Sequence, residues 1–196
     1  GIQGVSGSKT YSSLLSYFGR VDYDFNNKYY FTGNIRADGS SRFRDDNRWG
    51  YFPSFSAGWK FSEENFMQGL RWLSSAKLRG GWGKVGNQYS VGAYEYLNYL
   101  DKFNSSRYVF GMNQTQYYGA MVLESFANND ITWETTKTTT VGTDLSFLEN
   151  KILFTAEYYY RKTEDLLVQK PVSIMTGRLR NHPPPQNVGT VENKGW

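Results

Sequence analysis

Few residues in this 196-residue chain combine the types and spacing that covalent chemistry needs. Asp45 and Asp46 are adjacent carboxylates, but consecutive residues do not converge on one atom without help, so a solvated loop explains them better than metal binding or acid–base catalysis. The chain has no Cys and one His, His182, which excludes a thiolate metal site and a disulfide framework and leaves no Ser–His motif. We therefore expect no catalytic residues, no metal and no cofactor, and hence no enzyme.

A glycine-rich run at residues 80–86 superficially resembles a loop that cradles phosphate. The Gly-Lys-Ser/Thr ending of such loops is missing, and the glycines fall along an expected strand, where glycine more often marks a bend or a bulge. The net charge of +4 comes from Lys and Arg that are scattered among acids, so no basic stripe for nucleic acid is indicated. Neither phosphate nor nucleic acid is an expected ligand.

Aromatic side chains between residues 86 and 132 are the strongest candidates for ligand contact. This connection runs for more than forty residues without a clean apolar strand, and loops of this length are usually functional or disordered. It holds too many rings for a disordered linker, and short strands are expected within it. A ring with a hydroxyl can stack on a sugar or a peptide and still form hydrogen bonds, or it can pack the loop against itself, and the sequence leaves both roles open. The predicted ligand- or partner-binding residues are Tyr108, Phe110, Tyr117 and Tyr118, with the adjacent pair leading.

Alternation with a period of two predicts the strands that carry these loops. Successive runs place apolar and aromatic residues on one parity and polar residues on the other. Their length suits tilted strands, which cross a bilayer in about 9–11 residues. We predict six full antiparallel strands and a seventh begun, at residues 14–25, 28–37, 49–61, 75–85, 133–147, 152–161 and 187–196. The apolar parity predicted to face lipid includes Leu15, Val21, Phe31, Ile35, Phe55, Ala57, Leu78 and Phe154.

Short and long connections alternate between these strands. Asn26 and Asn27, and likewise Glu149 and Asn150, suit tight turns, because Asn tolerates positive φ. In outer-membrane barrels the short turns are periplasmic and the long loops extracellular. The long polar connections predicted to lie outside are residues 38–48, 87–132 and 164–189, the last containing a stiff run of prolines at 183–185.

Residues 62–74 interrupt the strand pattern. Ser62 can cap a helix whose first turn carries Glu63 and Glu64. The apolar residues Phe66, Leu70 and Leu73 follow at helical spacing. We predict one short helix against the short-turn rim.

Composition agrees with a membrane barrel and excludes other classes. Aromatic residues make up 18% of the chain, whereas the mean hydropathy of −0.63 excludes a bundle of membrane helices. Barrel strands alternate, so their mean hydropathy stays low while rings gather at the membrane interfaces.

Five stretches carry a resemblance to a known family. They are residues 15–21 (LSYFGRV), 36–43 (RADGSSRF), 47–59 (NRWGYFPSFSAGW), 78–88 (LRGGWGKVGNQ) and 191–195 (VENKG). Together they resemble the SusC/RagA family of TonB-linked outer-membrane transporters over most of the chain.

The resemblance implies a 22-stranded barrel filled by an amino-terminal plug, with energy supplied through TonB and a SusD-like surface lipoprotein acting as a lid. It implies active import of oligosaccharides or peptides across the outer membrane of a Bacteroidetes-type Gram-negative cell. On this interpretation residues 1–196 are a fragment of a single barrel domain, without the plug. Two alternatives remain open from the residues: a soluble all-β carbohydrate-binding module, and a passive porin.

Overall fold

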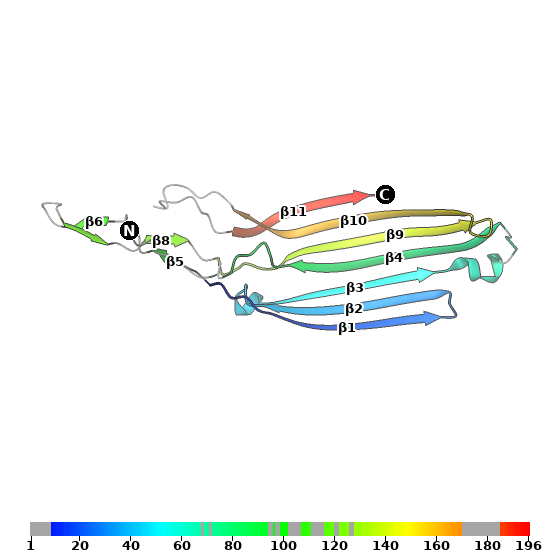
Figure 1. Cartoon of the computed structure of the whole chain (residues 1–196), viewed down its shortest axis with the longest axis horizontal. Coiled ribbons are helices and arrows are strands. Elements are labelled where there is room, and N and C mark those ends of the chain that lie inside the picture. The colour runs from blue at the N-terminus through cyan, green and yellow to red at the C-terminus, as the bar shows by residue number, and fades with distance from the viewer. Residues whose placement is uncertain are drawn as a thin grey trace, which may run out of the picture.

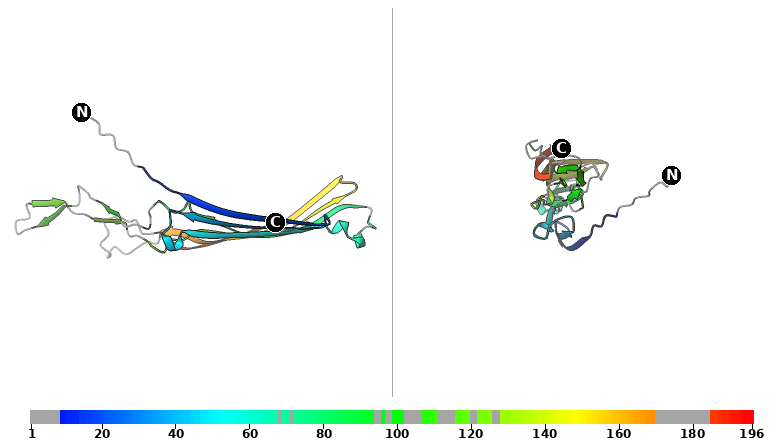
Figure 2. Two further views of the ribbon diagram at one scale, coloured as in Figure 1. Left: turned by 90° about the horizontal axis from the view of Figure 1, so that it is seen from below. Right: turned by 90° about the vertical axis from the view of Figure 1, so that its left-hand side faces the viewer.

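A single curved antiparallel sheet dominates the structure. The computed structural model describes residues 9–67, 69, 70, 72–93, 96, 99–101, 107–110, 116–119, 122–125, 128–169 and 185–196, with backbone only between 99 and 125. Seen edge-on, the strands of the main sheet form one layer (Figure 2). Its seven strands run in the order β1-β2-β3-β4-β9-β10-β11 (Figure 1). Their bounds are β1 Leu14–Phe25, β2 Tyr29–Ser40, β3 Trp49–Trp59, β4 Leu73–Asn87, β9 Glu134–Phe147, β10 Ile152–Gln169 and β11 Pro185–Gly195.

Two tight turns close one end of this sheet as the sequence predicts. Asn26 and Asn27 both have φ of 54°, and the amide of Lys28 donates to the carbonyl of Phe25 at 3.1 Å. The second turn follows Phe147, with positive φ at Leu148, Glu149 and Asn150. Asn is among the residues that adopt this left-handed backbone at least cost, so the local sequence sets both hairpins.

The predicted helix at residues 62–74 is wrong in kind and in length. Two 3₁₀ helices stand in its place, η2 Phe61–Glu63 and η3 Asn65–Met67, and β4 begins at Leu73. The Ser62 hydroxyl caps nothing and is buried without a hydrogen-bond partner. Leu73, the last apolar position of the helical pattern, instead begins strand β4, where it pairs with Phe147 of β9.

Four of the strands, β2, β4, β10 and β11, extend beyond their predicted ends. Strand β10 continues to Gln169 across a bulge, where Asp165 has φ of 60° and the Asn187 amide donates to the Asp165 carbonyl at 2.7 Å. The last long connection is therefore residues 170–184, shorter than predicted, and it lies outside the described residues together with His182 and most of the proline run. Pro185 itself begins β11.

Four short strands lie within the connection from β4 to β9. They form two small antiparallel sheets, β5 Tyr99–Asp101 with β8 Val122–Ser125, and β6 Arg107–Phe110 with β7 Gln116–Gly119. Both lie beyond the long-loop end of the main sheet (Figure 1). The expectation of short strands in this connection is confirmed.

Across the described part of the chain, no helix has the length and apolar character needed to cross a membrane.

The pairing register between neighbouring strands aligns their alternating residues, so that the sheet has two continuous faces. One lateral row joins Tyr23, Phe31, Ala57, Gly80, Val141 and Tyr158, each directly opposite the next. The neighbouring row on the other side joins Asp22, Thr32, Ser56, Gly81, Thr140 and Tyr159. Because directly paired residues share a face, the sheet has an apolar face and a polar face. The eight residues predicted to face lipid are all exposed on the apolar face, with Val21 at 67% and Ile35 at 55%.

Candidate ligand site at the long-loop end

The apolar face forms a band that crosses the sheet obliquely. At the long-loop end it starts on β1 at Leu15, but on β10 it reaches only to Tyr160, which shares a row with Val21, six residues farther along β1. At the short-turn end it stops on β1 at Phe25 but continues on β10 to Ile152, four residues past the row of Phe25. Five strand spacings separate β1 from β10.

This offset measures the tilt of the strands against the band. At about 3.3 Å per residue the shift is roughly 13–20 Å, and at about 4.8 Å per strand the sheet is roughly 24 Å wide, which gives a tilt of roughly 30–40°. Strands of transmembrane barrels tilt by about 35–45°. The strands therefore cross the apolar band at the angle expected for barrel strands that cross a bilayer.

Aromatic rings edge the band at the short-turn end. Tyr29 stacks on Trp59 with ring centres 6.5 Å apart and planes 6° apart. Between the two 3₁₀ helices, the Glu64 carboxylate accepts hydrogen bonds from the Tyr29 hydroxyl at 2.7 Å and the Trp59 indole at 3.2 Å, and it pairs with Lys28 at 3.3 Å. These hydrogen bonds hold the pKa of Glu64 below its usual value, and the bond from Tyr29 has the largest effect. At the other end of the band Trp49 stacks on Tyr17 at 6.0 Å.

A dry cluster fills the polar side of the long-loop end. Phe43 and Trp133 are 1% and 7% exposed, and their ring centres lie 4.8 Å apart. Phe52 meets the edge of Trp133 at 5.4 Å, and Val91 and Ile131 complete the cluster. We call these five residues the loop-base cluster. They come from β3 and from the bases of the connections at 41–48 and 88–133.

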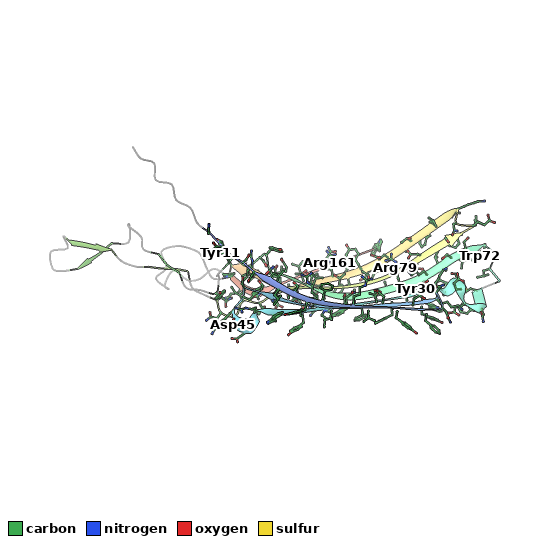
Figure 3. The ribbon with its side chains drawn as sticks, turned by 60° about the horizontal axis from the view of Figure 1, so that its bottom comes forward. Tyr11, Tyr30, Asp45, Trp72, Arg79 and Arg161 are labelled. Atoms are coloured by element: carbon green, nitrogen blue, oxygen red, sulfur yellow. The ribbon has the colours of Figure 1, made fainter. Side chains whose placement is uncertain are left out.

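The loop-base cluster corrects two predictions. Residues 38–48 are not simply a solvated loop, because Phe43 and Ser40 are fully buried, whereas Asp45 is exposed and pairs with Arg48 at the loop tip (Figure 3). Trp133, predicted as the first residue of the strand at 133–147, lies just before β9 and packs into the cluster, with its indole N–H donating to the Arg48 carbonyl at 3.3 Å. Packing against distant loops, rather than strand alternation, decides the position of this ring.

Hydrogen bonds fasten the same loop bases together. The Arg42 guanidinium donates to the Val91 carbonyl and lies over the Tyr89 ring, 5.8 Å from its centre. The Asn187 side chain accepts from the Thr132 amide at 2.9 Å and donates to the Thr132 carbonyl at 3.0 Å. The three long connections therefore leave the sheet from one shared, packed base.

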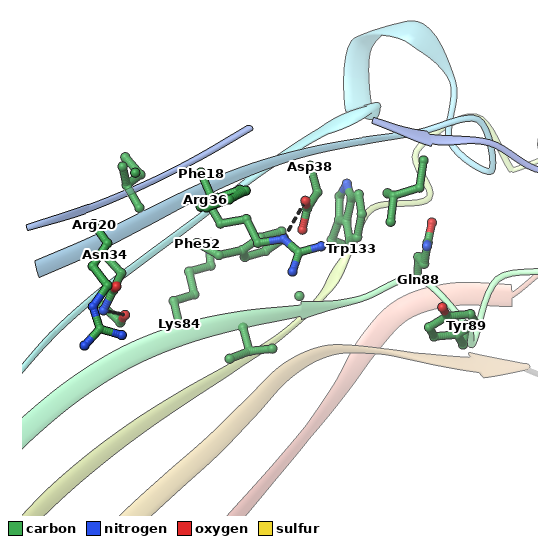
Figure 4. A pocket seen from close by; sticks show the side chains of 16 residues that line it. Phe18, Arg20, Asn34, Arg36, Asp38, Phe52, Lys84, Gln88, Tyr89 and Trp133 are labelled. Atoms are coloured by element: carbon green, nitrogen blue, oxygen red, sulfur yellow. Dashed lines mark hydrogen bonds and ion pairs between the residues drawn. The ribbon is translucent and has the colours of Figure 1, made fainter. Parts of the chain in front are cut away.

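A pocket of about 640 Å³ lies beside this base on the polar side of β1 and β2 (Figure 4). The Arg36 Nε donates to the Asp38 carboxylate at 2.7 Å, and Asp38 is 6% exposed. Phe18, directly opposite Arg36 in the register, is 85% exposed. Phe52 and Trp133 of the loop-base cluster form the inner wall of the pocket.

Ion pairs continue down the polar face toward the short turns. Arg79 Nε donates to Asp144 at 3.1 Å, and another guanidinium nitrogen of Arg79 pairs with Glu157 of β10. Lys77 lies over the Tyr30 ring, 4.8 Å from its centre. These contacts join β2, β4, β9 and β10 through polar side chains, which is the chemistry of a wetted inner wall rather than of a reaction centre.

The pocket offers binding rather than covalent chemistry. Its polar groups are guanidinium, ammonium, carboxylate, amide and hydroxyl side chains, and its rings are Phe18, Phe52, Tyr89 and Trp133. Such a set can orient a ligand through hydrogen bonds and stacking.

The four predicted site residues lie in the outer hairpin formed by β6 and β7. Tyr108 pairs with Tyr118, Val109 with Tyr117, and Phe110 with Gln116. Their side chains lie outside the described part of the structure. Their role therefore stays a prediction.

The family model for the TonB dependent receptor-like β-barrel matches residues 3–196. This chain belongs to that family. Its members are outer-membrane barrels that act as receptors and transporters, not enzymes, and membership excludes a soluble carbohydrate-binding module. The resemblance to SusC and RagA proteins is confirmed by the relatives described next.

Two curated relatives match almost the whole chain. The TonB-dependent receptor SusC of Bacteroides thetaiotaomicron is 43% identical over 187 residues, which cover 95% of this chain and 18% of SusC. The TonB-dependent receptor P3 of Formosa agariphila is 37% identical over 185 residues, or 94% of this chain and 18% of the relative. The chain thus spans about a fifth of the length of these relatives.

Solved structures agree with the sequence relatives. A chain in the structure of the RagAB peptide transporter superposes with a TM-score of 0.76 and 26% identity, covering 94% of this chain and 19% of that one. A chain of the RagAB peptide importer in the 'open-open' state gives 0.76 and 25%, covering 93% and 19%.

Sequence reasoning missed the pocket because its signal is a pair of exceptions to a pattern: Phe18 of β1 and Phe52 of β3 lie on the polar parity, on either side of Arg36 in the register. Phe18 is an aromatic residue on the polar parity of β1, between Ser16 and Arg20. An apolar ring on the wrong parity near a strand end is the feature that could have revealed this site.

Proposed function

We propose that this chain is part of the wall of an outer-membrane, TonB-dependent importer of oligosaccharides or peptides. The observation that carries the proposal is the oblique apolar band opposite a polar face, in a chain whose family model matches from residue 3 to residue 196. A lipid-facing slab and a wetted interior are what a transport barrel needs. The chain supplies seven strands of the main sheet, and both edge strands, β1 and β11, have free edges for further strands of a barrel, 22 in all by analogy with the family.

The importer works with a SusD-like surface lipoprotein and draws energy through the TonB complex, which acts on a plug elsewhere in the protein. This follows by analogy with SusC and with RagAB, whose structures are described as those of a peptide transporter. The protein lies in the outer membrane, with the long connections outside the cell and the short turns in the periplasm.

The outer hairpin of β6 and β7 contacts the substrate or the lid. Strand alternation places Tyr108, Phe110 and Tyr118 at register positions on one face of the hairpin and Tyr117 on the other. A partner that docks against one face therefore distinguishes the two adjacent tyrosines.

Single and double alanine variants of Tyr117 and Tyr118 in the full-length transporter test this role. Uptake, lid association and heat stability are measured separately, in cells with and without TonB. We expect the Tyr118→Ala variant to lose uptake or lid association while its heat stability is retained. Unchanged uptake and association with lowered stability would leave the rings a packing role only, and uptake that persists without TonB would indicate a passive porin.

A further inference from the structure

Phe18 is an exposed apolar ring on the polar face of β1. It lies on the face of β1 opposite the lipid-facing band, so a bilayer cannot cover it. The loop-base cluster does not include it, and 85% of its surface is exposed. Large apolar surfaces that remain open beside a pocket commonly mark a binding site.

The polar groups around Phe18 are already fixed in place and mostly neutralised. Arg36 donates to Asp38 at 2.7 Å and to the Ser16 hydroxyl at 3.3 Å. Arg20 contacts both carboxylate oxygens of Asp22, at 2.7 Å and 3.0 Å. Each arginine is thus held by the acid two residues along its own strand. The two paired arginines therefore add little net attraction for an anion, and Lys84 is the one lining cation without an ion pair among the described residues.

Guanidinium groups only donate hydrogen bonds and carboxylates only accept them. A fixed Arg36–Asp38 pair therefore presents a donor and an acceptor side by side, with the Asn34 amide adding both kinds nearby (Figure 4). A sugar hydroxyl both donates and accepts, and neighbouring ring hydroxyls repeat this pattern. The opposite, C–H-rich face of a sugar ring suits an open aromatic ring.

We propose that this pocket binds one uncharged sugar unit of an oligosaccharide, stacked on Phe18 with its hydroxyls on Arg36, Asp38 and Asn34. The proposal rests on the importer function proposed above and narrows its substrate class. It places a second contact point on the barrel wall, below the outer hairpin. A volume of about 640 Å³ lies within the roughly 300–1,000 Å³ of small-ligand sites.

Binding to the purified full-length transporter in detergent tests the site. The probes are fluorescent neutral hexasaccharides of glucose, mannose, galactose and xylose, with a sulfated hexasaccharide and a pentapeptide as alternatives. Phe18→Ala and Arg36→Gln should each weaken the binding of a neutral hexasaccharide about tenfold. Phe18→Tyr keeps the ring and should retain binding. The matched control is Phe31→Ala, the same truncation on the opposite face, which should leave the affinity unchanged.

Each outcome decides the proposal. It is overturned if no neutral hexasaccharide binds the parent, if Phe18→Ala binds as tightly as Phe31→Ala, or if only the peptide or the sulfated probe responds to the variants. A general loss of fold would weaken binding in Phe18→Tyr as well, and that result also counts against the stacking role. TonB-dependent uptake by cells carrying the parent is scored separately: its absence refutes the importer function, whereas uptake with unaltered Phe18→Ala binding refutes only this site.

Discussion

An arginine at Ile35 should destabilise the folded protein by about 2–4 kcal/mol, the cost of a cation at the middle of a bilayer. The structure gives the depth of Ile35 within the apolar band. Between Tyr29 and Gly39 the apolar face of β2 spans ten residues, or roughly 33 Å along the strand and roughly 26 Å across the band at the tilt found above. Ile35 is six residues from Tyr29, roughly 16 Å into the band, and 55% of its surface is exposed.

Two companion variants separate depth from general disruption. Phe31 is two residues from Tyr29, only about 5 Å inside the ring-lined edge, so Phe31→Arg should cost about 1 kcal/mol or less. Ser56 is exposed on the polar face, and Ser56→Arg should stay within about 0.5 kcal/mol of the parent. The order of cost is therefore Ile35, then Phe31, then Ser56.

Guanidinium titration of the full-length protein folded into phospholipid bilayers measures the three costs. A difference of 2–4 kcal/mol changes the folded-to-unfolded ratio by about 30-fold to 1,000-fold, well outside the error of such titrations. Equal costs at Ile35 and Ser56 would refute the assignment of the two faces. Equal costs at Ile35 and Phe31 would refute the oblique band.

Three further results are expected. Gly86→Ala would drive a methyl group into the Phe52 ring, so it should cost about 1–3 kcal/mol in chemical denaturation, and Phe52→Leu in the same chain should recover part of that loss. The pKa of Glu64 is lowered in the folded state, so its contribution to stability is present above the ordinary carboxyl pKa of about 4.3 and is lost as the pH falls through the folded-state pKa. Glu64→Gln should therefore flatten the acid side of a curve of unfolding free energy against pH. An unchanged curve would show that the contacts of Glu64 contribute nothing to stability. An epitope inserted at Asn27 should be hidden from antibody on intact cells and reached only after the outer membrane is opened; labelling of intact cells would invert the topology.

Most of the main sheet could be predicted because its signal is local and repetitive. Parity alone assigns a face to residues such as Val21 and Phe55, and Asn at 26 and 27 sets a turn without help from the rest of the chain. Prediction failed where distant packing decides. The spacing of Phe66 and Leu70 is compatible with a helix, but cross-strand pairing takes the last turn of that pattern into β4.

The site at the long-loop end was largely beyond local reasoning. Phe43 lies in a stretch of charged and small residues whose composition indicates a solvated loop, but the loop-base cluster buries it, in contact with Trp133 ninety residues later. Neither segment carries a sequence pattern that indicates its contact with the other. The tyrosines of the outer hairpin, by contrast, are predicted from composition, which selects candidate residues without showing how they are used, and their role stays a prediction.

The two ends of the sheet differ in their connections and in the packing that supports them. At the short-turn end, rings and the Glu64 carboxylate mark the edge of the apolar band, and two of the three connections there are tight turns. At the other end, the long connections leave a sheet that has no second layer within the described part of this chain. The loop-base cluster supplies that support by burying Phe43, Phe52 and Trp133 at the point where the connections depart. Because the same rings form the inner wall of the pocket, any ligand held there rests on the base from which the outer loops extend.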